Sequence, residues 1–212
     1  MSGVYRAGMP GDAGPAWEER LRDGRRIEIR PIRPEDRQEL ADGMRRLSPE
    51  SRYRRFFAPT DELSQSELAY LSEVDHHDHE ALIALEPGTG EGIGVARFVR
   101  SRDDRELAEL AVAVADSWHR QGVGGALLQR LTERAREEGI RRFSAEILTE
   151  NRPMLDLIHE LGEVHVKNRE QGAFEIEVEL PEEGLGAALR HALRATGRGL
   201  ARVRRLPPAR RS

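Results

Sequence analysis

The sequence predicts an α/β fold in which a mixed sheet carries helices on both faces. Segments with alternating or continuous apolar residues, typical of strands, are interspersed with segments whose apolar residues recur at helical spacing. A glycine-rich turn at residues 119–126 joins the most apolar of these strands to an amphipathic helix. The chain of 212 residues, 34% of them charged, is long enough to bury an α/β core and is typical of a globular protein.

The first half of the chain is expected to contain a tail, a strand, three helices and a hairpin. Residues 1–24 are rich in Gly, Pro and Ala without periodicity and predict a disordered N-terminal tail. Pro34, Ser48 and Ser64 are residues typical of helix starts. The expected elements are a strand at 26–33, helices at 34–46, 48–57 and 64–71, and hairpin strands at 81–85 and 92–99.

In the second half, strands and helices alternate before a final pair of strands. The segment 106–114 is apolar on both faces in its second half and predicts a buried, central strand. The helix that follows the glycine turn is expected to end before Gly139. The remaining expected elements are a strand at 142–148, a helix at 152–161, and strands at 164–168 and 173–180.

The glycine-rich turn predicts an anion site. Backbone N–H groups from about Arg120 to Ala126 are expected to be unpaired at the start of a helix, where the helix dipole favours negative charge. Glycines at 122, 124 and 125 would let a diphosphate approach without obstruction by a Cβ atom. The turn lacks the Gly-Lys-Ser/Thr of a P-loop, and Leu127 stands where a dinucleotide-binding fingerprint needs its third glycine.

Two motifs carry a resemblance to a known family. The segment His119-Arg-Gln-Gly-Val-Gly124 resembles the pyrophosphate-binding motif of the Gcn5-related N-acetyltransferase (GNAT) family, with His in place of the usual Gln or Arg. The segment from Glu150 to Gly162 resembles a second block of that family. The resemblance covers residues 25–180, predicts a domain at 25–181, and is strongest for bacterial protein-lysine acetyltransferases. Three further segments share it, at residues 29–36, 47–57 and 73–82.

The resemblance implies acetyl-CoA as the acyl donor, without a metal. It also implies a GNAT-type, mostly antiparallel sheet in which strands 106–114 and 142–148 splay apart, so that the pantetheine arm pairs as another strand would. Asn151 would orient the pantetheine or a water, or would only cap the following helix. The implied cofactor-binding residues are Ala111, Val112, Ala113, Val114, His119, Arg120, Gln121, Gly122, Val123, Gly124, Gly125, Ala126 and Asn151.

Glu109 is the candidate catalytic base. It interrupts an apolar strand just before the pantetheine-pairing segment, where related acetyltransferases carry their base, and partial burial is expected to raise its pKa. The alternative is a solvated edge carboxylate like Glu106. A general acid is harder to find, because Ile158 stands where the family often has a tyrosine and His159 is expected to face another way. Since the chain has no Cys, transfer to the amine is expected to be direct or to use another nucleophile.

The expected acceptor is a protein lysine, and the expected location is the cytoplasm, because no apolar run has the length of a membrane span or a secretion signal. A small-molecule amine acceptor and a catalytically weak acetyl-CoA sensor are the alternatives. The segment Asp75-His-His-Asp-His-Glu80 is expected to border the acceptor groove and attract a cationic side chain. Zinc is less favoured there, because adjacent side chains cannot all converge on one ion.

The C-terminal segment 182–212 is strongly basic, with eight Arg against two Glu. Its leucines recur at helical spacing and predict an amphipathic helix. Such a helix would bind an anionic membrane surface, a nucleic acid or an acidic partner, or would pack its leucines on its own domain.

Overall fold

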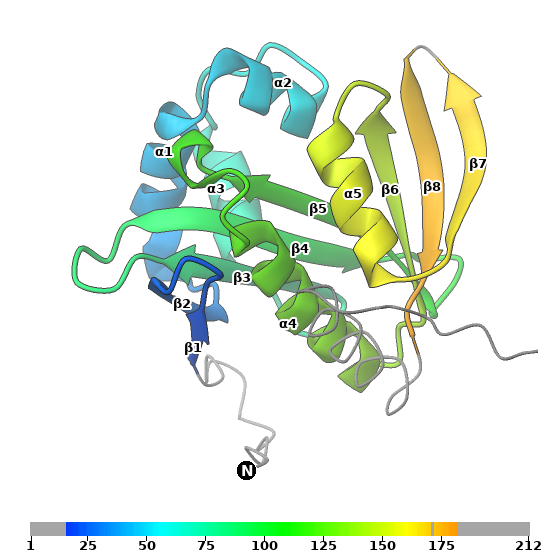
Figure 1. The fold of residues 1–212 in the computed structure, drawn as a ribbon, viewed down its shortest axis with the longest axis horizontal. Helices are drawn as coiled ribbons and strands as arrows, with labels where there is room; N and C mark the ends of the chain where they lie inside the picture. Colours follow the sequence, from blue (N-terminus) through cyan, green and yellow to red (C-terminus); the bar gives the residue numbers. More distant parts are fainter. Residues whose placement is uncertain (1–15, 171, 182–212) are drawn as a thin grey trace, which may run out of the picture. The chain divides into compact units, whose positions relative to one another are not determined.

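The structure, a computed structural model, describes residues 16–170 and 172–181 (Figure 1). The strands are β1 (Trp17–Arg20), β2 (Arg26–Pro31), β3 (His79–Leu85), β4 (Gly92–Arg100), β5 (Leu107–Val114), β6 (Arg142–Leu148), β7 (Val164–Glu170) and β8 (Ala173–Glu179). The helices are α1 (Arg37–Arg46), α2 (Pro49–Phe56), α3 (Gln65–Ser72), α4 (Val123–Glu137) and α5 (Arg152–Leu161), with short 3₁₀ turns η1 (Pro34–Asp36) and η2 (Asp116–Trp118).

All eight strands belong to one sheet, in the order β1-β2-β3-β4-β5-β6-β8-β7. Every neighbouring pair is antiparallel except β5 and β6, which are parallel. The mixed, mostly antiparallel α/β fold predicted from the sequence is therefore confirmed. Two predicted helix starts rest on side-chain caps, since the Ser48 hydroxyl accepts from the N–H of Ser51 and Ser64 forms a capping box with Glu67.

The N-terminal boundary differs from the prediction. Trp17–Arg20 forms β1 against β2, so the expected tail at 1–24 is wrong for this part, and residues 1–15 lie outside the described residues. A tertiary contact holds the strand: Arg130 of α4 donates to Glu19 with an Nε–Oε1 distance of 2.8 Å and lies over the Trp17 ring. Local sequence periodicity carries no sign of such a contact.

Helices cover both faces of the sheet. On one face, a Cβ atom built on Gly94 of β4 would lie 3.0 Å from Cδ1 of Leu127, so the glycine allows α4 to approach the sheet closely. On the other face, Leu40 and Met44 of α1 line a pocket together with Val95 and Arg97 of β4. The core between α4 and the sheet includes the fully buried rings of Phe98 and Phe143, whose centroids are 6.2 Å apart.

The sheet opens between β5 and β6. These strands pair at only three positions, which join Leu107, Ala108 and Glu109 to Arg142, Phe143 and Ser144. Beyond Glu109, β6 pairs with β8 on its other side, and β5 keeps β4 as its partner (Figure 1). The expected splay of the two central strands is thereby confirmed.

The chain divides into two units, residues 1–180 and 181–212. The predicted basic helix at 182–212 lies outside the described residues. Within residues 16–170 and 172–181, no helix combines the length and the apolar character needed to cross a membrane.

Candidate active site

The open edge of β5 faces the gap between β5 and β6. From Leu110 to Val114 the strand has no partner on this side among the described residues. The side chains from Ala111 to Val114 are partly exposed. Backbone amides and carbonyls of an extended ligand can therefore add to this edge as a further strand would.

The first turn of α4 lies at the end of this edge and offers unpaired N–H groups. Helix geometry leaves the N–H groups of Val123, Gly124 and Gly125 without an intrahelical acceptor, and no side chain among the described residues caps this turn. Ala126 differs from expectation, because its N–H already donates to the carbonyl oxygen of Gly122 at 3.0 Å. The anion-binding groups are thus fewer than the range Arg120–Ala126 predicted from the sequence.

The glycines of the turn have different roles. Gly122 is exposed and has a φ of 97°, a conformation that a residue with a Cβ atom adopts only with strain. A Cβ atom on Gly124 would instead lie 3.1 Å from Cδ1 of Leu157, so this glycine serves the packing of α4 against α5. The sequence suggested that Gly124 leaves space for a diphosphate. The structure contradicts this, because the Cβ position of Gly124 points toward α5, although the N–H of Gly124 remains available.

Two of the three side chains at the start of the motif bind the protein's own backbone. His119 Nε2 lies 2.9 Å from the carbonyl oxygen of Val114, and Gln121 donates to the carbonyl oxygen of Ser117 at 2.7 Å. Arg120 is exposed, has a φ of 59°, and has no hydrogen-bond partner in the described part of the chain. Arg120 is therefore the side chain of this motif that remains free to contact a phosphate.

Glu109 is the last residue of β5 that pairs with β6. The residue is exposed, so the partial burial expected from the sequence is wrong. Its neighbour across the ladder is Val99, and Val99 in turn lies opposite His79 of β3. Arg97 lies opposite Ala111, and Ala111 follows Glu109 by two residues along β5. Because side chains two residues apart in a strand point to the same face, Arg97 and Glu109 lie on one face of the sheet.

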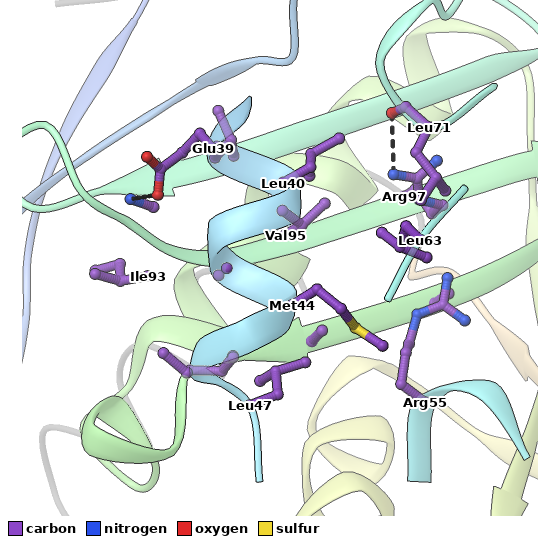
Figure 2. Close-up of a pocket in the computed structure, with 18 of the residues that line it drawn as sticks. Glu39, Leu40, Met44, Leu47, Arg55, Leu63, Leu71, Ile93, Val95 and Arg97 are labelled. Carbon is purple, nitrogen blue, oxygen red and sulfur yellow. Dashed lines mark hydrogen bonds between the residues drawn. The ribbon is translucent and has the colours of Figure 1, made fainter. Parts of the chain in front are cut away.

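A pocket of about 90 Å³ lies between α1 and strands β4 and β5 (Figure 2). Its walls are mostly apolar, and include Leu40, Met44, Phe56, Leu63, Ile93 and Ala111. Arg55 of α2 and Arg97 of β4 are the two arginines in this lining. Sequence reasoning missed both residues. The signal available for Arg97 was a charged residue within the otherwise apolar segment 92–99, and no comparable signal existed for Arg55.

Arg97 is held by two hydrogen bonds. Its Nη1 lies 3.1 Å from Nε2 of His79, and its Nη2 donates to the carbonyl oxygen of Leu71 at 3.1 Å. Burial, and then the positive charge of Arg97, lower the pKa of His79 to about 4, so the imidazole is neutral at pH 7 and can accept from the guanidinium. Burial, and then the positive charge of Arg55, lower the pKa of Arg97 to about 10, so Arg97 stays charged at pH 7.

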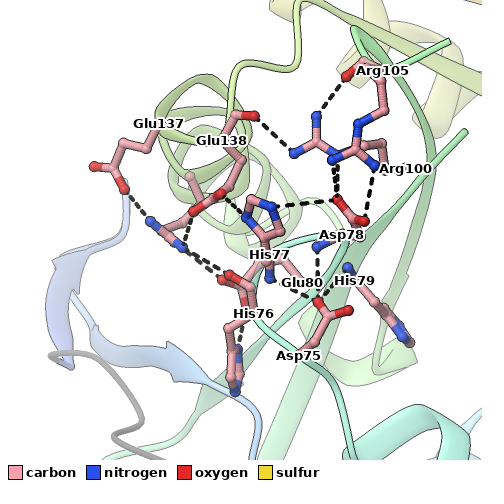
Figure 3. A network of polar contacts seen from close by, with 11 residues as sticks. Asp75, His76, His77, Asp78, His79, Glu80, Arg100, Arg105, Glu137 and Glu138 are labelled. Carbon is pink, nitrogen blue, oxygen red and sulfur yellow. Dashed lines mark hydrogen bonds and ion pairs between the residues drawn. The ribbon is translucent and has the colours of Figure 1, made fainter. Parts of the chain in front are cut away.

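The segment 75–80 forms a network of internal contacts (Figure 3). The Asp75 carboxylate accepts the N–H groups of His77, Asp78 and His79. Asp78 binds Arg100 and Arg105, and the buried Glu80 binds Arg134 with an Nε–Oε2 distance of 3.1 Å. These carboxylates have partners within the protein, and their attraction for a cationic acceptor stays a prediction. Among the described residues, no group of His, Asp or Glu has the arrangement of a metal site.

Residues of the second motif lie on α5. The Asn151 side-chain oxygen accepts from the N–H of Met154 at 3.3 Å, so Asn151 caps this helix. Ile158 is fully buried and His159 is exposed, as their spacing along the helix predicted. Ile158 has no titratable group, and His159 forms no hydrogen bond or ion pair with β5 in the described part of the chain.

Comparisons with known proteins agree with this geometry. The family described as "Acetyltransferase (GNAT) domain" matches residues 26–164. Acetyltransferase Pat of Mycolicibacterium smegmatis is 35% identical over 164 residues, which are 76% of this chain and 48% of that protein. Acetyltransferase PA5475 of Pseudomonas aeruginosa is 35% identical over 151 residues, 70% of this chain and 81% of that protein.

Among solved structures, the GNAT domain of S. lividans PAT is similar with a TM-score of 0.72 and 33% identity, over 78% of this chain and 97% of that domain. The chain spans about half the length of the Mycolicibacterium relative and nearly all of the S. lividans domain. The chain belongs to the GNAT acetyltransferase family.

Proposed function

We propose that this protein transfers an acetyl group from acetyl-CoA to an amine, and that the acceptor is a protein lysine. The observation that carries the proposal is the position of Glu109. It is exposed and occupies the last position at which β5 pairs with β6, so its carboxylate belongs to the start of the open edge of β5. A base at this position can take a proton from an amine that approaches the open edge.

The described residues fit the parts of acetyl-CoA. The unpaired N–H groups of Val123, Gly124 and Gly125 would hold its diphosphate, and the open edge from Ala111 to Val114 would pair with the amides of its pantetheine arm. Acetyl-CoA would supply an activated thioester at this edge. Backbone N–H groups of Ala111–Ala113 would stabilise negative charge that develops on the acetyl oxygen.

The acceptor amine must lose a proton before it reacts, because a lysine is mostly protonated at pH 7. Glu109 would accept this proton directly or through a water. Arg55 and Arg97 lie in the lining next to β5, and their positive charges favour the neutral form of an amine bound beside them. Ile158 of α5 is buried and cannot donate a proton, and His159 is exposed. We therefore propose that a water molecule donates the proton that the departing thiolate takes up.

The choice of a protein lysine rests on exposure and on resemblance. Glu109 is exposed, and Tyr70 of α3 is 57% exposed, so a side chain on the surface of a second protein can reach this region. The motifs of the chain also resemble those of bacterial protein-lysine acetyltransferases. A small-molecule amine is the second candidate, favoured by the pocket beside β5.

The experiment is acetyl transfer to a mixed panel of proteins, lysine peptides and small amines, measured by mass spectrometry. Glu109→Gln should lower kcat by roughly 10²–10⁴ and leave acetyl-CoA affinity close to that of the parent. The control is Glu106→Gln, which removes an exposed carboxylate three residues earlier, paired with Arg141 at 3.2 Å. Near-parental turnover of Glu109→Gln at pH 7, with chemistry rate-limiting, would contradict the assignment and favour an acetyl-CoA sensor.

A further inference from the structure

Arg97 differs from the other deeply buried arginines. Arg100 and Arg134 are 8% and 4% exposed, and each binds a carboxylate, Asp78 and Glu80 respectively. Arg97 is 6% exposed and has no carboxylate partner among the described residues. A buried charge without a counter-charge is costly, so its retention calls for an explanation.

Arg55 is the second arginine of the pocket lining that has no carboxylate partner among the described residues. It forms no hydrogen bond and no ion pair with any residue in the ranges 16–170 and 172–181, and its guanidinium carbon lies 5.1 Å from the centroid of the neighbouring Phe56 ring. Burial lowers the pKa of Arg55, and the negative charge of Glu109 opposes this shift. Arg55 also acts on Arg97 through its charge, and Figure 2 shows its guanidinium pointing toward the end of the pocket where Arg97 lies.

A purely structural role explains only part of this arrangement. The contacts of Arg97 with Leu71 and His79 join β4 to the end of α3 and to β3. They leave donors of the guanidinium unused, since two of its N–H groups satisfy both contacts. No such contact explains Arg55. Two positive charges therefore face a mostly apolar pocket, and Glu109, the carboxylate that acts on Arg55, is exposed.

We propose that Arg55 and Arg97 form a subsite for a carboxylate carried by the acceptor amine. The carboxylate would bind the two guanidinium groups, the apolar part of the acceptor would occupy the pocket between α1 and β4, and the amine would reach Glu109 on the same face of the sheet. Charge-assisted hydrogen bonds from arginine to carboxylate are strong and directional, which makes such a subsite selective. The inference rests on the proposed function, because it names the chemistry of the amine that is acetylated.

A carboxylate near an amine comes from two sources, a free amino acid with an apolar side chain or a lysine peptide with an acidic neighbour. The first test measures binding without catalysis. It compares the change in the melting temperature of the protein that hexanoate causes with the change that hexanamide causes. These probes share their apolar chain and differ in charge. Hexanoate should stabilise the parent protein and Arg54→Met, and should lose this effect in Arg55→Met. Arg54 is the matched control because it lies on the same helix and is paired with Glu50 at 2.5 Å.

The second test measures acetyl transfer to matched acceptors. Leucine is compared with leucinamide, and a lysine peptide with glutamate beside the lysine is compared with the same peptide carrying glutamine. The acid should be preferred in kcat/KM by about tenfold or more in at least one pair, as expected for hydrogen bonds to a charged group. Arg55→Met should bring this ratio close to one mainly through KM, and Arg55→Lys should retain part of it.

The outcomes separate this inference from the proposed function. Acetylation of an amine without any preference for the acid, or a preference that survives in Arg55→Met, overturns the carboxylate subsite and leaves the proposed function intact. Equal thermal shifts with hexanoate and hexanamide overturn the subsite as well. Failure of every acceptor in the panel contradicts the proposed function, while hexanoate binding that requires Arg55 still supports an anion site in the pocket.

Discussion

The glycines around α4 allow a quantitative prediction, because three of them sit in different surroundings. Gly122 precedes the helix with a φ of 97°, and Gly139 follows it with a φ of 79° and open space where a Cβ atom would stand. Alanine at positive φ costs about 1–2 kcal/mol. Gly122→Ala and Gly139→Ala should therefore lower the free energy of unfolding by similar amounts.

Gly124→Ala should behave differently. Its Cβ atom would meet the flexible end of Leu157 at 3.1 Å, and alanine is more favourable than glycine in a helix by up to about 1 kcal/mol. The two effects oppose each other, so the variant should stay within about 0.5 kcal/mol of the parent. Its N–H remains in place, so acetyl-CoA binding should be nearly unchanged.

Urea unfolding followed by circular dichroism measures the stability of these variants, and isothermal titration calorimetry measures acetyl-CoA affinity. Gly122→Ala should weaken acetyl-CoA binding as well as stability, because strain at this residue displaces the N–H groups of the first turn of α4. Gly139→Ala is the control, since it has the same backbone penalty at the far end of the helix. Equal acetyl-CoA affinity in these two variants would refute the assignment of the diphosphate to the start of α4.

The other predictions concern Glu80 and His79 of the segment 75–80, and the Asn151 cap of α5. Glu80→Gln should lower the free energy of unfolding by about 1–2 kcal/mol in urea, because it removes the buried carboxylate beside Arg134, which keeps Glu137 and Glu138 as partners. His79 has a folded pKa of about 4, below its unfolded value, so its contribution to stability is complete above about pH 6.5 and is lost as the pH falls toward 4. Unfolding measured across this range should show a steeper loss in the parent than in His79→Gln, and parallel curves would contradict the neutral imidazole beside Arg97. Asn151→Ala should cost about 1 kcal/mol, and Asn151→Asp should restore this stability through its cap. If Asn151→Asp keeps the stability but binds acetyl-CoA more weakly, as calorimetry would show, the amide also contacts the donor.

Local signals predicted the fold well because the fold depends on them. Ser48 and Ser64 cap the helices whose starts they predicted, and the glycine turn leads into α4 as expected. The strand β1 was missed because Trp17 owes its place to a contact with Arg130, more than a hundred residues away.

The site was predicted less completely than the fold. Glu109 could be chosen from its place in an apolar strand, but its exposure depends on where β5 and β6 separate, which the sequence alone does not show. Gly124 matched a phosphate motif, although the space left by its lack of a Cβ atom is next to Leu157. Arg55 and Arg97 come from elements distant in sequence, and only the packing of α2 against the sheet brings them into one pocket.

The short pairing of β5 with β6 has a consequence for how motion is distributed in the protein. The antiparallel ribbon of β6, β8 and β7 is joined to the remaining described strands by three residue pairs. A ligand that lies along the open edge adds contacts at this narrow connection, and any local opening that breaks those contacts becomes less favourable by the corresponding binding free energy. Amide hydrogen exchange in β8, which has β6 between it and the open edge, should then slow when the donor binds. A bound donor would thus couple the motion of the ribbon β6-β8-β7 to that of strands β1 to β5, and its release would remove this coupling.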